Sequence, residues 1–161
     1  MWSRASHAIA LGFGSGLSPV APGTVGTLWA WLVFVVVDPL LAPAHWAAIL
    51  VAGFVIGIWA CERTARDLGV ADPGAIVWDE IVAFWLVLLF VPASGFAQFG
   101  AFVLFRFFDI VKPPPIRYYD ARFRNGFGTM FDDLLAALFT LLVFALILAP
   151  ARAVAMPGGM Q

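Results

Sequence analysis

Residues 105–133 read FRFFDIVKPPPIRYYDARFRNGFGTMFDD, and apolar sequence flanks them on both sides. This stretch holds five of the nine basic residues of the chain and four of its ten acidic residues. Only 12% of the residues in the whole chain are charged, so such a concentration of charge indicates a function. We therefore expect residues 105–133 to carry most of an active site at a membrane surface.

Composition places the chain in a membrane. Its 161 residues are 63% hydrophobic, whereas soluble domains are roughly 45–50% apolar and about 25% charged. Sixteen Phe and seven Trp residues fit a lipid-facing surface with aromatic anchors at its two interfaces. The net charge of −1 argues against a nucleic-acid partner, which would need a basic surface. The length is that of one domain.

Five apolar runs separated by short connections predict an all-α integral membrane bundle of about five apolar helices. The runs are residues 25–37, 45–60, 81–91, 96–108 and 130–149. The first run is short for a membrane span, which needs about 17–25 residues. Pro150 is expected to end the last helix, because proline cannot continue one. We expect one membrane-embedded domain over residues 1–150 and a flexible tail over residues 151–161.

The distribution of basic residues predicts the orientation in the membrane. With five spans, the N-terminus and the loops around residues 61–79 and 105–133 lie on one face. That face collects eight basic residues, and the other face has only Arg152. Cytoplasmic loops are enriched in Lys and Arg, so we expect a multi-pass protein of the bacterial inner membrane with its active site facing the cytoplasm.

Two acidic pairs begin apolar runs. Asp79 and Glu80 precede the third run, and Asp132 and Asp133 stand near the start of the fifth. Acidic residues are favoured at a helix N-terminus by the helix dipole, so a structural role is one reading. Charge at membrane depth is costly and usually functional, and adjacent carboxylates repel each other unless they share a cation. A metal site is the reading that explains both pairs.

Asp109 stands near the C-terminal end of its predicted helix, where the dipole disfavours an anion by about 0.3–1 kcal/mol. A cationic neighbour such as Arg106 or a bound ion must compensate. Together with the two acidic pairs, Asp109 makes five carboxylates, and few nitrogen or sulfur ligands accompany them. Oxygen ligands of this kind suit Mg²⁺, which also bridges phosphate oxygens.

Two segments are candidates for binding phosphate. Lys112 precedes Pro113-Pro114-Pro115, which we expect to hold the chain extended, and a lysine there offers a point charge to a phosphate. Residues 12–24 are rich in glycine, and their amides could form an anion-binding nest. The alternative for this loop is a simple connection with Thr24 as the N-cap of the next helix. The candidate phosphate ligands are Lys112, Arg106, Gly14, Ser15, Gly16 and Thr24, and residues 117–124 are read as a linker facing lipid headgroups.

Four separate motifs resemble those of the phosphatidylglycerophosphatase A family. They are Gly12-Phe13-Gly14-Ser15-Gly16 with residues 19–27, Asp79-Glu80-Ile81, residues 108–116 (FDIVKPPPI) and residues 126–133 (GFGTMFDD). Ala83 and Asn125 stand where the family often has glycine. The resemblance implies a phosphoric monoester hydrolase that converts the phospholipid phosphatidylglycerophosphate to phosphatidylglycerol and phosphate, depends on Mg²⁺ and serves phospholipid synthesis at the inner membrane.

On this hypothesis the catalytic and metal-binding residues are Asp79, Glu80, Asp109, Asp132 and Asp133. They would hold one or two Mg²⁺ ions, and either a water molecule or an aspartate would attack phosphorus. Two alternatives remain. One is a small membrane carrier or ion-conducting bundle with an intramembrane acidic cluster, although such carriers often show internal repeats that this sequence lacks. The other is a phosphatidyltransferase that uses a CDP-activated lipid.

Overall fold

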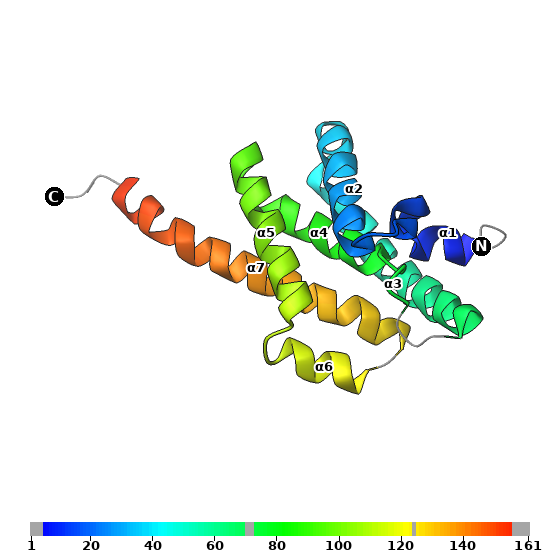
Figure 1. Cartoon of the computed structure of the whole chain (residues 1–161). Helices are drawn as coiled ribbons and strands as arrows, with labels where there is room; N and C mark the ends of the chain where they lie inside the picture. Colours follow the sequence, from blue (N-terminus) through cyan, green and yellow to red (C-terminus); the bar gives the residue numbers. More distant parts are fainter. Residues whose placement is uncertain (1–4, 70–72, 124, 156–161) are drawn as a thin grey trace.

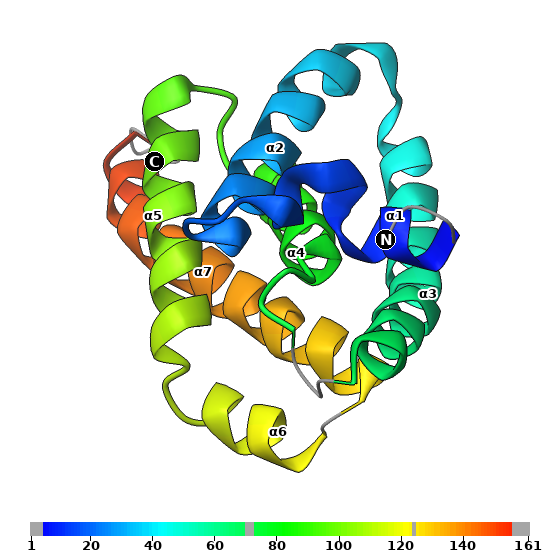
Figure 2. The same ribbon diagram turned by 45° about the vertical axis from the view of Figure 1, so that its right-hand side comes forward.

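Helix α4 (Trp78–Phe90) runs through the middle of the molecule, and helices α2, α3, α5 and α7 surround it (Figure 1; Figure 2). The computed structural model describes residues 5–69, 73–123 and 125–155. Nine of the thirteen residues of α4 are buried, as expected of a helix that is hydrophobic all round. No glycine or proline interrupts it, and it ends just before Pro92, since the residue that precedes a proline disfavours helical backbone.

Helices are the regular secondary structure of the described residues, and no strand occurs among them. Short helix α1 (Ala5–Ala10) and the 3₁₀ turn η1 (Gly12–Leu17) precede the bundle. Helix α2 (Pro22–Val37) continues into the 3₁₀ turn η2 (Asp38–Leu40), and α3 (Pro43–Leu68) follows. After α4 come α5 (Gly95–Val111), the short α6 (Ile116–Arg122) and the long α7 (Gly126–Ala155).

Within the described part of the chain, three helical segments are long and apolar enough to cross a membrane: Pro22–Leu40, Pro43–Leu68 and Gly126–Leu148. Helix α4 is only about 20 Å long at 1.5 Å per residue, which is less than the roughly 30 Å hydrocarbon core of a bilayer. It is a core helix of the bundle. Helix α5 has 17 residues and is close to the lower limit for a span. The apolar all-α class is therefore observed, whereas a count of five spans stays a prediction.

Several helix ends differ from those predicted. Helix α2 begins at Pro22 with Ala21 as its N-cap in the left-handed conformation, so Thr24 lies inside the helix and is not the cap. Helix α7 begins at Gly126 and continues through Pro150 to Ala155, so Pro150 does not end it; proline removes one N–H donor but leaves the other backbone hydrogen bonds available. Of the expected tail, residues 151–155 are helical and residues 156–161 lie outside the described part of the chain.

Hydrogen bonds from tryptophan side chains connect neighbouring helices inside the bundle. Trp85 Nε1 donates to the carbonyl of Ala30 on α2 at 2.9 Å, and Trp78 Nε1 donates to the carbonyl of Gly53 on α3 at 2.9 Å. Trp46, Trp78 and Trp85 are buried, so not every tryptophan is an interface anchor as the composition suggested. A buried indole needs a partner for its N–H group, and helix carbonyls supply it here.

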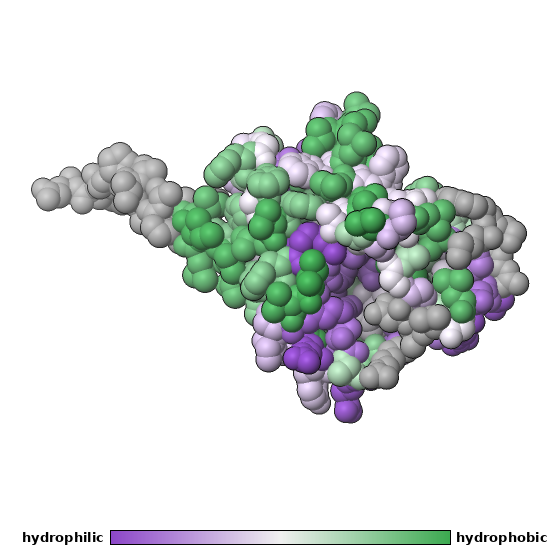
Figure 3. Space-filling model, viewed as in Figure 1, coloured by the Kyte–Doolittle hydropathy of each residue, from purple (hydrophilic) through white to green (hydrophobic). Residues whose placement is uncertain are grey.

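The outer surface of the bundle is apolar over most of its length. Figure 3 shows hydrophobic residues over α7 and the upper part of α5, whereas hydrophilic residues gather around the lower end of α5 and over α6. Large exposed apolar side chains include Leu32, Val36, Val51, Val55, Trp59, Phe96, Phe99, Val103, Leu142 and Leu146. Monomeric soluble proteins rarely expose apolar surface on this scale, so this surface indicates a membrane protein with a polar face at one end.

Candidate active site

A polar cavity of about 480 Å³ lies where the first turn of α4, the end of α5, helix α6 and the second turn of α7 meet. All five carboxylates predicted from the sequence line it: Asp79, Glu80, Asp109, Asp132 and Asp133. Four of them, all but Glu80, are buried. These residues come from three helices that are far apart in the sequence, so the fold brings the predicted acidic residues together.

Asp79 and Glu80 occupy the first turn of α4, as predicted. The backbone N–H of Glu80 donates to Asp79 Oδ1 at 3.0 Å, which fixes the Asp79 carboxylate at the helix start. Glu80 lies against the N-terminal turn of α2, because a side-chain carbon built on Gly23 would stand 2.0 Å from Glu80 Oε1. A glycine at position 23 is therefore what allows α2 to approach this carboxylate so closely.

Arg106 joins two of the carboxylates. Its Nη1 lies 2.6 Å from Asp109 Oδ2 and donates to Glu80 Oε1 at 3.0 Å. The prediction that a cation compensates Asp109 at its helix C-terminus is confirmed, since residues three apart on a helix are neighbours. Only 13% of the Arg106 side chain is exposed. Its role as a phosphate ligand stays a prediction, because the contacts observed for it are to these two carboxylates and to the Thr27 hydroxyl group.

Lys112 caps α5 and bridges to the other helices. It takes the left-handed conformation, with φ of 44°, and its Nζ donates to Asp120 Oδ1 at 2.7 Å and also to Asp132 Oδ2. Burial by itself would lower the pKa of Lys112, but the carboxylates of Asp132 and Asp120 outweigh that effect and raise the pKa above its ordinary value. The ammonium group is therefore charged and stands at the wall of the cavity.

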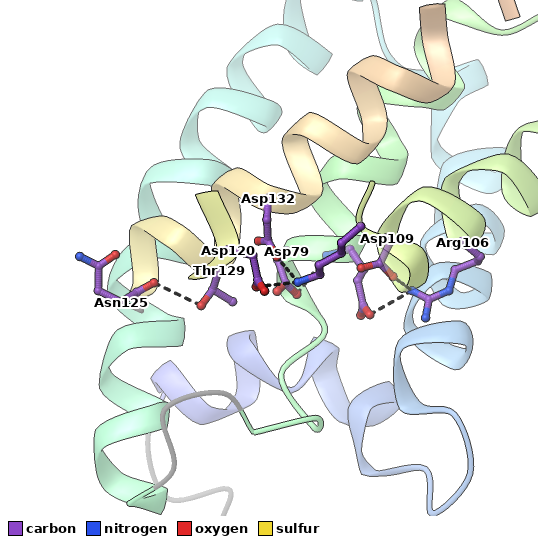
Figure 4. A network of polar contacts seen from close by, with 9 residues as sticks. Asp79, Arg106, Asp109, Asp120, Asn125, Thr129 and Asp132 are labelled. Atoms are coloured by element: carbon purple, nitrogen blue, oxygen red, sulfur yellow. Dashed lines mark hydrogen bonds and ion pairs between the residues drawn. The ribbon is translucent and has the colours of Figure 1, made fainter. Parts of the chain in front are cut away.

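Asp120 belongs to this site, although the sequence placed it in a linker. Residues 113–115 form a turn where an extended segment was expected, and the turn leads directly into α6. Helix α6 packs against α7, so Asp120 comes to face Asp132 across the amine of Lys112 (Figure 4). Arg117 and Thr129 also line the cavity. No spacing in the sequence pointed to Asp120, because its position depends on the direction that the chain takes after the three prolines.

Asp132 and Asp133 lie deeper in α7 than expected. The helix begins at Gly126, so the pair stands in the second turn, where the dipole of the helix N-terminus has weakened. Asp132 Oδ1 and Asp133 Oδ2 are buried and have no hydrogen-bond partner among the described residues. Burying a carboxylate oxygen without a hydrogen-bond partner costs free energy of folding. Structural hydrogen bonding therefore does not account for the burial of these two oxygens.

Among the residues that the structure describes, Glu80, Asp109 and Asp133 are arranged so that they could hold a metal ion. One carboxylate oxygen from each lies within 4.8 Å of the others. Around the cavity, six carboxylates, Asp120 included, accompany three basic side chains, those of Arg106, Lys112 and Arg117, among the described residues. The excess negative charge, the unpartnered oxygen of Asp133 and the oxygen-only donor set all fit a hard divalent cation.

Residues 12–17 of the glycine-rich segment do not line the polar cavity. The amides of Gly14 and Gly16 both donate to the carbonyl of Leu11, at 2.9 and 3.1 Å, and Ser15 Oγ donates to the carbonyl of Gly12. Ser15 lines a separate hollow against α2, and Thr24 is not among the residues that line the polar cavity. Lys112 thus lines the polar cavity with the carboxylates, whereas Gly14, Ser15, Gly16 and Thr24 are not among its lining residues.

The fold and the site together define a class: an all-helical, apolar-surfaced protein with a buried carboxylate site suited to a divalent cation. Comparison with known proteins gives the family. The family model described as phosphatidylglycerophosphatase A matches residues 8–148. The chain therefore belongs to the phosphatidylglycerophosphatase A family and is a phosphatase, as the resemblance in the motifs indicated.

Two of the similar curated proteins carry the same name, and a third is named for a different lipid phosphatase. A Haemophilus influenzae protein named phosphatidylglycerophosphatase A is 45% identical over 138 residues, covering 85% of this chain and 85% of that protein. A protein of the same name from Escherichia coli is 41% identical over 135 residues, covering 83% and 78%. A Bacteroides thetaiotaomicron protein provisionally named phosphatidylinositol-3-phosphatase is 41% identical over 144 residues, covering 85% and 89%. No solved structure gives a significant match.

Proposed function

We propose that this protein hydrolyses phosphatidylglycerophosphate to phosphatidylglycerol and inorganic phosphate, with Mg²⁺ held by the carboxylate cluster. The observation that carries the proposal is the convergence of Glu80, Asp109 and Asp133 beside a cavity that also presents Lys112. The names of two relatives supply the substrate. As a multi-pass protein of the bacterial inner membrane, it would act in phospholipid synthesis with its cavity facing the cytoplasm, where basic residues gather.

The proposal gives the five predicted carboxylates and Lys112 a part in this reaction. A bound Mg²⁺ would neutralise phosphate charge and provide Lewis acidity toward the phosphoryl oxygens. Glu80, Asp109 and Asp133 would hold it, with Asp79 and Asp132 as further ligands or proton acceptors. Lys112 would bind a nonbridging phosphate oxygen, for which a charged amine is well suited. A water oxygen bonds to phosphorus, the bond from phosphorus to the glycerol oxygen breaks, and that oxygen takes up a proton.

A phosphate-release assay tests the proposal directly. Purified protein in detergent micelles is given phosphatidylglycerophosphate with Mg²⁺, with excess EDTA, and with Mg²⁺ restored after EDTA. We expect phosphate release that EDTA abolishes and Mg²⁺ restores. A phosphatidyltransferase would instead need a CDP-activated lipid and release CMP, and a carrier would release no phosphate. Phosphatidylinositol 3-phosphate serves as a comparison substrate, because one relative is named for it; faster release from that lipid would contradict the assignment of the headgroup.

A further inference from the structure

A second, apolar groove of about 220 Å³ lies between α3, α4 and α7. Its floor is made of buried side chains, among them Val82, Ala83 and Met130. Its rim includes Val51 and Val55 on α3, whose side chains are 67% and 61% exposed. The groove therefore opens on the apolar outer surface of the bundle, where a bilayer would supply hydrocarbon.

The groove and the polar cavity share one residue, Asp79, which lines both. From Asp79 the groove follows α4 to Leu86, a distance of about 10 Å along the helix axis. Among the described residues that line the groove, Asp79 is the only charged one, and all the others are apolar. A ligand that occupies both spaces must therefore carry its charge at one end and a hydrocarbon chain at the other.

The groove is held in shape by contacts beneath it. Trp78 Nε1 donates to the carbonyl of Gly53, which binds α4 to α3 beside the groove. A side-chain carbon built on Gly53 would come within 3.2 Å of Val82 Cγ2, so the absence of a side chain there sets the spacing of the two helices. A preformed groove lowers the ordering cost of binding a flexible chain.

We propose that this groove binds one acyl chain of the lipid substrate while the phosphate occupies the adjoining polar cavity. The inference rests on the proposed function for the identity of the phosphate group. The shared wall at Asp79 favours a substrate chain as the occupant, because a chain attached to a headgroup bound in the polar cavity lies next to the groove. The groove thus selects lipid phosphomonoesters over water-soluble ones.

The kinetic test compares substrates with and without chains. Long-chain phosphatidylglycerophosphate, its short-chain form and the chain-free phosphomonoester are assayed with wild type, with Leu86→Trp and with Val51→Trp. Val103→Trp, on the exposed surface of α5, is the matched control. Each groove methylene is worth up to about fourfold in kcat/KM, from a burial free energy of about 0.8 kcal/mol. Both groove variants should lower kcat/KM for the long-chain substrate at least tenfold more than for the chain-free one.

Equal losses on both substrates, or no loss beyond that of Val103→Trp, would overturn the proposal. A binding test that needs no turnover separates its failure from failure of the proposed function. A lipid phosphomonoester with a photoreactive diazirine in its acyl chain is crosslinked to wild-type protein, and labelled residues are mapped by mass spectrometry. The proposal is supported if this probe labels mainly residues 50–55 and 82–86 and a phosphatidylcholine probe labels them weakly. This outcome supports acyl-chain binding in the groove even if no phosphate is released. Equal labelling by both probes rejects it, whatever the enzyme's activity.

Discussion

At the scale of single residues, the site is an acidic cluster that three basic side chains of the described part of the chain only partly balance. Arg106 neutralises the Glu80 and Asp109 side, and Lys112 neutralises the Asp120 and Asp132 side. Asp133 lies between these two pairings with an unpartnered buried oxygen. A metal ion would supply the partner that this buried oxygen of Asp133 lacks among the described residues.

Replacing Asp133 with Asn should separate metal binding from folding. We expect activity to fall more than about a hundredfold, since even residues outside the ligand shell are worth 10–100-fold. In EDTA the variant should unfold at the same temperature as wild type or higher, because one of several repelling carboxylates is gone. Mg²⁺ at a hundred times its Kd should stabilise wild type by about 2.7 kcal/mol and the variant by much less.

Thermal unfolding followed by circular dichroism, with and without Mg²⁺, measures this difference. Asp67→Asn is the control, because Asp67 pairs with His7 and Arg63 away from the cavity, and this variant should keep the Mg²⁺ response. An Asp133→Asn enzyme that retains both its activity and its stabilisation by Mg²⁺ would rule Asp133 out as a ligand.

Asp120 should act through Lys112. Asp120→Asn is expected to raise KM up to about tenfold, since the pair is partly exposed and therefore screened, and to change KM little further in a Lys112→Ala background. Because the raised pKa of Lys112 lies above that of an unfolded lysine, the stabilisation from this amine is complete below about pH 10.4 and is lost only above it. Steady-state kinetics between about pH 6 and 9 should show no inflection from Lys112. Additive effects in the double variant would show that Asp120 acts independently.

At the scale of helices, the distance between neighbouring helices decides which side chains of the site come into contact. Helix α2 reaches Glu80 only because position 23 has no side chain. Gly23→Ala should force Glu80 or α2 to move, costing about 1–3 kcal/mol of stability by overpacking and most of the activity by displacing a metal ligand. Gly95→Ala is the matched control, since a side-chain carbon there meets nothing within 4 Å. Phosphate-release rates and unfolding temperatures of the two variants give the comparison, and equal behaviour of both would refute the packing argument.

The sequence predicted those features that depend on local order along the chain. The acidic pair at the start of α4 and the compensation of Asp109 by Arg106 follow from positions within one helix. Asp120 was missed because its place depends on the turn at residues 113–115 and on the packing of α6 against α7. The central position of α4 was missed because a helix surrounded by lipid and a helix surrounded by protein can have the same apolar sequence. The amides of Gly14 and Gly16 were expected to be free to bind phosphate. The sequence does not show that they instead donate hydrogen bonds to the carbonyl of Leu11.

At the scale of the whole molecule, the two ends of the bundle differ. The polar cavity and α6 lie at one end, where hydrophilic residues gather (Figure 3). At the other end, η2 and the connection from α4 to α5 lie together, since Asp38, Pro39 and Ala93 line one shallow hollow. This separation along α4 and α5 is what a membrane enzyme needs if a charged headgroup is to enter from water while its chains stay in lipid.

The asymmetry predicts which residues can be reached from each side of the membrane. In a Cys61→Ser background, Tyr118→Cys on exposed α6 should react only with a membrane-permeant thiol reagent in intact cells, because α6 faces the cytoplasm in the proposed topology. Ala93→Cys should react with an impermeant reagent from outside. Inverted vesicles should reverse both results, and each variant must first show wild-type phosphate release. Labelling of Tyr118→Cys from outside in intact cells would invert the topology, since the basic loops and the cavity would then face away from the cytoplasm.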